Sequence, residues 1–159
     1  MIQLLATPLY NVLEGIYDAC RDSVTPVPGS VVYCDLACGY MEHSGIYVGN
    51  NRIAHLNGQG HIELVTPEEF IAGTSAMNIY VSCHDSVAAG YHSVAQRAKL
   101  LIGHQREYNF IMDNCHQFTS GCLSGEYNNN DNFLFMLKQQ ASNKIGANSW
   151  RFWSDSDWR

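Results

Sequence analysis

"HSGIYVGNNRIAHL", residues 43–56, is the stretch that decides the fold, because two apolar, strand-like runs flank a short polar turn. Residues 44–48 include Ile46, Tyr47 and Val48, which are typical of strands, and residues 52–56 carry apolar side chains at Ile53, Ala54 and Leu56. Gly-Asn-Asn at 49–51 lies between them, and both residue types tolerate the left-handed backbone that tight hairpins need. The stretch therefore predicts a β-hairpin.

The length of the turn decides where the two histidines of this hairpin lie. A three-residue loop at 49–51 pairs Gly45 with His55. Side chains alternate along a strand, so His43 and His55 then share one face as diagonal neighbours, roughly 7–8 Å apart at the backbone. A two-residue loop would shift the register by one residue and separate them. The sequence favours the three-residue loop and a pair of neighbouring imidazoles.

A second stretch, "FIMDNCHQFTSG" at 110–121, places a cysteine where a helix is expected to begin. An apolar run meets Asp113 and Asn114, and the helical pattern starts at Cys115. A thiol on the first turn of a helix feels the positive end of the macrodipole and the unpaired backbone N–H groups. Both stabilise a thiolate, so this position suits a nucleophile.

Together the two stretches predict a catalytic triad. His43 would take the proton of Cys115, and His55 would hold His43 in the right tautomer and share its charge. The hydroxyl groups of Tyr40 and Tyr47 are candidate donors to an oxyanion near this site. The backbone N–H of Cys115 is another.

The rest of the chain is consistent with one α+β domain spanning 1–159. We expect an antiparallel sheet of about five strands, packed against the helix that carries Cys115 on the histidine face. The other predicted elements are a helix at 7–22, strands at 30–34, 61–65 and 78–83, a capped short helix at 66–70, a helix at 87–103, an apolar segment at 133–137 and a Trp-rich tail at 148–159.

Composition excludes several classes of protein. The net charge of −6, with nine Lys and Arg in all, argues against nucleic acid and anionic membrane surfaces as partners. No run approaches the ~20 apolar residues of a membrane span, so at most peripheral contact with lipid is expected. The N-terminal residues lack the pattern of a signal peptide, so we expect a cytoplasmic protein with six free thiols. No metal or organic cofactor is expected.

Zinc binding is an alternative role for His43, together with two of the cysteines. Cys34, Cys38 and His43 follow a C-x3-C-x4-H spacing, which is irregular for a structural zinc site and lacks a second close ligand pair. Zinc is therefore disfavoured. The remaining histidines are interpreted as surface residues: His61, His84, His92, His104 and His116.

Several motifs resemble those of the lecithin:retinol acyltransferase (LRAT) family. They are "PGS" at 28–30, "HSGIYVGNNRIAHL" at 43–56, "VAQRAKLLIGHQREYNF" at 94–110 and "DNCHQF" at 113–118. The resemblance covers residues 27–125 and implies a circularly permuted, papain-like fold of the NlpC type. It implies Cys115 as nucleophile, His43 as base and His55 as the third member. Asn114 is part of the cysteine box and a candidate for contact with the substrate or the oxyanion.

The resemblance also implies an activity, namely a thiol-dependent acyl hydrolase or acyltransferase acting through a thioester on lipid esters. Glu42 and the pair His116-Gln117 depart from the family pattern, which leaves the substrate open. Two alternatives remain: a cysteine peptidase or amidase of the NlpC type with the same triad, and a silent binding module that holds a partner with its Trp-rich tail. The sequence does not indicate an oligomeric state.

Overall fold

The computed structural model describes residues 22–107 and 114–159. The helix expected at 7–22 lies outside this part of the chain, apart from its last residue. In chain order the elements are β1 (Val31–Asp35), β2 (Glu42–Gly49), β3 (Arg52–Leu56), β4 (Ile62–Val65), α2 (Pro67–Ile71), β5 (Tyr80–His84), β6 (Val87–Ala88), α3 (His92–Leu100), α4 (Cys115–Ser124), α5 (Leu134–Ile145), β7 (Ser149–Phe152) and the short 3-10 helix η1 (Asp155–Asp157).

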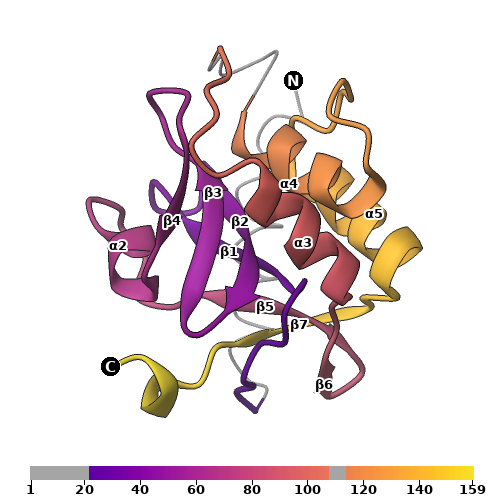
Figure 1. Cartoon of the computed structure of the whole chain (residues 1–159). Coiled ribbons are helices and arrows are strands. Elements are labelled where there is room, and N and C mark those ends of the chain that lie inside the picture. Colours follow the sequence, from indigo (N-terminus) through magenta and orange to yellow (C-terminus); the bar gives the residue numbers. More distant parts are fainter. Residues whose placement is uncertain (1–21, 108–113) are drawn as a thin grey trace, which may run out of the picture.

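A seven-stranded antiparallel sheet lies at the centre of these elements (Figure 1). Its strand order is β4-β3-β2-β1-β5-β6, and β7 also pairs with β5. The α+β class is confirmed, but the expected number of five strands was too low. The two additional strands, β6 and β7, both pair with β5. β6 consists of Val87 and Ala88, and β7 is formed by part of the Trp-rich tail. The helix predicted at 87–103 is therefore shorter and begins at His92.

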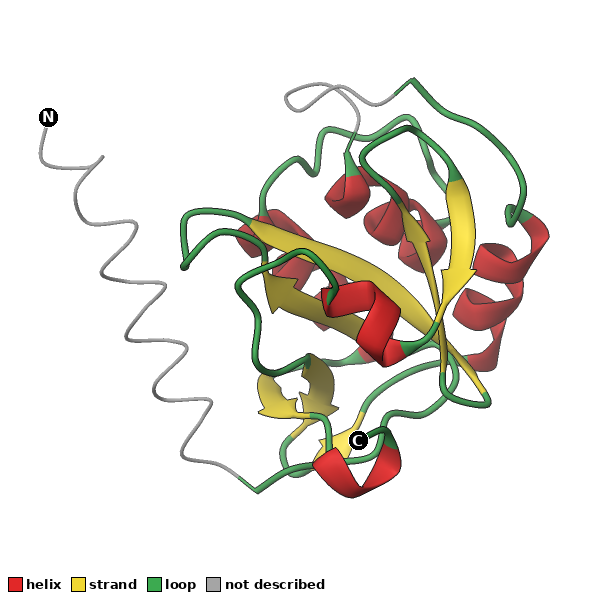
Figure 2. Ribbon diagram, turned by 90° about the vertical axis from the view of Figure 1, so that its left-hand side faces the viewer, coloured by secondary structure: helices red, strands yellow, loops and turns green. Residues whose placement is uncertain are grey.

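Helices cover both faces of the sheet, but unequally. α3, α4 and α5 lie on one side and the short α2 lies on the other, the side from which Figure 2 is seen (Figures 1 and 2). We call these sides the three-helix face and the α2 face. The core of the three-helix face includes Val31, Ile46, Leu56, Phe118 and Leu137, and the core of the α2 face includes Val32, Ile53, Val65, Phe70 and Trp153. Successive residues of a strand alternate between the two cores, as the pleat requires.

The hairpin turn differs from the prediction, yet the predicted register survives. Gly49 pairs with Arg52, so the loop has two residues, Asn50 and Asn51, both with φ of 53°. This is the left-handed geometry of a type I′ turn, which Asn accepts at low cost. A bulge between Tyr47 and Gly49 inserts one extra residue in β2 and cancels the one-residue shift.

The short helix α2 begins as its sequence predicts. The Thr66 hydroxyl oxygen accepts a hydrogen bond from the N–H of Glu69, and the Glu69 carboxylate accepts one from the N–H of Thr66, which completes a capping box. Pro67 occupies the first turn, where its missing N–H costs nothing. The helix buries Phe70 against the sheet.

The Trp-rich tail belongs to the core of the molecule. Trp150 packs on the three-helix face, whereas Trp153 and Trp158 pack on the α2 face. All three are at most 7% exposed. The idea that this tail presents tryptophans to a partner is therefore wrong, because burial of these large side chains stabilises the sheet instead.

Candidate active site

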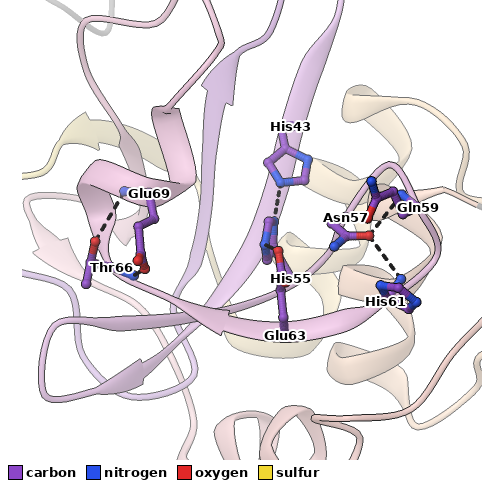
Figure 3. A network of polar contacts seen from close by, with 8 residues as sticks. All are labelled: His43, His55, Asn57, Gln59, His61, Glu63, Thr66 and Glu69. Carbon is purple, nitrogen blue, oxygen red and sulfur yellow. Dashed lines mark hydrogen bonds and ion pairs between the residues drawn. The ribbon is translucent and has the colours of Figure 1, made fainter.

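His43 and His55 meet on the α2 face, as the hairpin register predicted. The Nε2 atom of His43 lies 2.5 Å from the Nδ1 atom of His55 (Figure 3). The Phe70 ring packs on both imidazoles, with ring centroids 4.7 Å and 5.7 Å away. Gly45 lies between the two histidines on this face, where a Cβ atom would be 3.2 Å from the Cβ of His55. The close packing holds the two rings in one arrangement.

Cys115 is the first residue of α4, as expected, and Asn114 is its N-cap. The Asn114 side-chain oxygen accepts hydrogen bonds from the N–H groups of His116 and Gln117, and the Gln117 side chain accepts one from the N–H of Asn114. The Asn114 side-chain amide donates to the carbonyl of Asn132. The Asn114 side chain thus anchors the helix start, and the N–H of Cys115 has no hydrogen-bond partner within residues 22–107 and 114–159.

The thiol of Cys115 lies among polar groups whose combined effect favours its ionised form. Its Sγ atom is 3.9 Å from the carbonyl oxygen of Glu42 and 4.0 Å from the Nδ1 atom of His116. Burial raises the pKa of the thiol, but the charge of His43 and hydrogen bonds with the His43 ring and with the N–H and hydroxyl of Ser44 more than offset it. The net result is a pKa below the ordinary value for cysteine, as a nucleophile requires.

The position of α4 corrects one part of the expected geometry. Its side chains pack on the three-helix face, where Ser44 contacts both His116 and Thr119, so the helix does not cover the histidine face. Alternation along β2 then directs His43 to the opposite side of the sheet. The start of α4 lies beside the first residues of β2, which brings Cys115 close to His43.

Two polar residues near the thiol were not anticipated as part of the site. The hydroxyl of Ser44 is fully buried and lies 2.8 Å from His116 Nδ1 and 3.0 Å from Thr119 Oγ1. His116, expected at the surface, is 5% exposed, and burial lowers its pKa to about 4. A neutral His116 can donate from Nδ1 to the Ser44 oxygen, and Thr119 donates to the carbonyl of Cys115, so the single Ser44 proton is shared between Thr119 Oγ1 and the thiolate. The position of His116 in the first turn of α4, beside Cys115, could have indicated its burial near the thiol.

Glu63 of β4 is a third residue that the sequence did not indicate. It pairs with His55 across β3 and β4, and its Oε1 atom lies 3.0 Å from His55 Nε2 (Figure 3). Burial lowers the pKa of His55, and Glu63 partly opposes this shift. Partial burial raises the pKa of Glu63, but hydrogen bonds from Asn57 and His55, together with nearby His61, lower it overall. Pairing the predicted strands at 52–56 and 61–65 as a hairpin could have suggested the contact between His55 and Glu63.

A cleft of about 490 Å³, partly open to solvent, leads to the thiol. Its lining is mostly apolar and is formed by Leu36, Tyr40, Met41, Glu42, Asn114, Cys115, His116, Asn132 and Phe133. Of the two tyrosines considered, Tyr40 is 75% exposed and lines the cleft. Tyr47 is buried at the far end of β2, where its hydroxyl accepts a hydrogen bond from the N–H of Asn51. The structure therefore brings only Tyr40 of these two to the cleft.

The two cysteines of the zinc alternative lie in different environments. Cys34 is buried in β1, and desolvation strongly raises its thiol pKa, whereas Cys38 is exposed in the following loop. Within the described ranges, no three His, Cys, Asp or Glu side chains are arranged to hold a metal ion. Nor does this part of the chain contain a helix with the length and apolar character needed to cross a membrane.

The candidate site lies in a region that matches a known protein family. Residues 25–128 match the model of the lecithin retinol acyltransferase family, a span that includes both histidines and the cysteine. No curated protein matches the chain. Because the family match covers more than half of the sequence, the chain belongs to the lecithin retinol acyltransferase family.

Proposed function

We propose that the protein is a thiol-dependent acyl hydrolase or acyltransferase that acts on lipid esters through a thioester on Cys115. The observation that carries the proposal is the Cys115 thiol, whose pKa is lowered by His43 and which lines a largely apolar cleft. The family, whose description names an acyltransferase, supports an acyl substrate.

The reaction follows from the order of the side chains. His43 takes the thiol proton, and the Cys115 sulfur attacks the acyl carbonyl carbon to form a tetrahedral oxyanion. When the intermediate collapses, the ester C–O bond breaks and His43 returns the proton to the leaving alcohol. Water or an acceptor alcohol or amine then gives a proton to His43 and attacks the thioester, which releases the product and restores the thiol.

The roles of the other residues follow from their contacts. His55 accepts a hydrogen bond from His43 and orients it. The N–H of Cys115, at the positive end of α4, donates to the oxyanion. Asn114 positions this N–H by capping the helix, since its own side chain is already hydrogen-bonded. Tyr40 contacts the substrate at the rim of the cleft.

The covalent intermediate is the direct test. Incubation with a short activated ester, followed by an acid quench and peptide mass spectrometry, should add one acyl mass to the peptide that carries Cys115. Cys115→Ala should abolish the adduct, and His43→Ala should slow its formation by about a hundredfold or more, as expected for loss of a general base. Cys38→Ala removes an exposed cysteine and should leave the adduct unchanged.

A panel of phospholipid, ester and peptide donors then distinguishes the alternatives. Labelling by a phospholipid supports the lipid acyl activity. Labelling by peptides or amides alone points to a peptidase or amidase. Failure of every donor to label Cys115 in the folded protein would overturn the proposal in favour of a binding module.

A further inference from the structure

Glu63 terminates a chain of three polar side chains on adjacent strands. His43 on β2, His55 on β3 and Glu63 on β4 are joined by contacts of 2.5 Å and 3.0 Å (Figure 3). Direct pairing of His55 with Glu63 in the β3–β4 ladder fixes the second contact. Glu63 lies within the span that matches the family model.

The chemistry of the three groups sets the direction of every hydrogen bond. An ionised carboxylate only accepts, so Glu63 requires the proton of His55 to be on Nε2. A neutral His55 then has its lone pair on Nδ1 and must accept from His43 Nε2–H. The free lone pair of His43 is therefore on Nδ1. This is the nitrogen available to take the proton of Cys115.

We propose that Glu63 is a positioning residue that selects the tautomers of His55 and His43 and thereby presents a basic nitrogen to Cys115. Its negative charge also stabilises the imidazolium that forms when the thiol proton moves to His43. Without this carboxylate, His55 can carry its proton on Nδ1, which would force His43 to carry its own proton on the nitrogen facing the thiol. The inference rests on the proposed role of His43 as the base.

The surroundings limit how large the charge effect can be. The Glu63 side chain is 44% exposed, so solvent and salt screen its charge. Asn57 also hydrogen-bonds to it, and His61 is the other titratable group beside it. On the His43 side, Cys34 of β1 is the paired residue across the ladder. We therefore expect the tautomer effect to exceed the charge effect.

Two substitutions separate these effects. Glu63→Gln keeps an oxygen that can accept from His55 Nε2–H but removes the charge, and should slow alkylation of Cys115 by iodoacetamide at about pH 6 by roughly two- to fivefold. Glu63→Leu removes the acceptor as well and should slow it by about tenfold or more. Nitrogen-15 NMR of the His55 ring should show the proton on Nε2 in the wild type and in Glu63→Gln, but not in Glu63→Leu.

The matched control is Glu68→Leu, because Glu68 is an exposed carboxylate in the first turn of α2, which also carries Phe70. It should alkylate at the wild-type rate. If Glu63→Leu alkylates like the wild type while His43→Ala is slow, the inference about Glu63 fails and the proposed base stands. An equal loss in Glu68→Leu would also overturn it. If His43→Ala itself has no effect, the proposed function fails.

If Glu63→Leu does not fold, Glu63→Gln still provides a test. A His55 proton on Nδ1 in the folded wild type or Gln variant would contradict the inference directly.

Discussion

Replacing Ser44 by alanine should make the nucleophile measurably weaker. The Ser44 hydroxyl is 0% exposed and hydrogen-bonds with the Cys115 thiol, where it lowers the thiol pKa. A hydrogen bond to a charged group is worth about 1.5–3 kcal/mol, and each pKa unit corresponds to about 1.4 kcal/mol. The pKa of Cys115 should therefore rise in Ser44→Ala, because the thiolate loses this hydrogen bond.

Alkylation kinetics provide the measurement, because iodoacetamide reacts with the thiolate. Below the pKa, the rate follows the thiolate fraction, so Ser44→Ala should react about ten- to a hundredfold more slowly at acid pH. The full pH profile should shift to higher pH, because a higher pH is then needed to ionise the thiol. Urea unfolding should show a loss of about 1–3 kcal/mol, since His116 and Thr119 each lose a buried partner.

Ser82→Ala is the matched control for this experiment. Ser82 is also fully buried, accepts a hydrogen bond from the N–H of Val31 and donates one to the carbonyl of Ala89, but it lies on β5. Its loss should lower stability to a similar extent and leave the pH profile of Cys115 in place. The reasoning is refuted if Ser44→Ala alkylates with the wild-type pH profile, or if Ser82→Ala shifts the profile equally.

Two further substitutions test the helix that carries the thiol. Burial lowers the pKa of His116 from 6.5 to about 4, so the unfolded chain binds more protons between these values and stability should fall as pH drops through this range. His116→Asn should remove up to about 3 kcal/mol of this pH dependence, as measured by urea unfolding at a series of pH values; an unchanged slope would contradict a neutral, buried His116. Asn114→Ala should destabilise the protein by about 1–2 kcal/mol through loss of the N-cap, whereas Asn114→Asp, which keeps the capping oxygen but not the amide N–H that reaches the Asn132 carbonyl, should lose less. Equal losses in the two variants would show that capping is not the role of this side chain.

The main features of the hairpin and of the cysteine helix could be predicted from the sequence because they are local. Side-chain alternation placed His43 and His55 on one face, and a small polar residue before Cys115 marked the start of a helix. The capped start of α2 at Thr66 could also be predicted from the sequence, since Thr66 and Glu69 lie within one turn. The turn length was wrong, but the register was right because a bulge in β2 compensates.

Features that depend on which segments meet in space could not be read from the sequence. The tail lacks a clear period, because its strand β7 has only four residues and its tryptophans fill cores on both faces of the sheet. The burial of His116 depends on the packing of α4 against Ser44, seventy-two positions earlier in the chain.

The sequence by itself determined the chemistry available to this protein: a thiol at a helix start, and two imidazoles that a hairpin brings together. Local backbone geometry is sufficient for that, because periods of two and of 3.6 residues set which side chains share a face. Only the tertiary structure decided that α4 lies on the face opposite His43, with Cys115 beside the first residues of β2, and that Glu63 pairs with His55. The position of α4 and the pairing of Glu63 with His55 depend on the order of the strands and on the register between them. Many such arrangements have similar local energies, and long-range packing selects one of them.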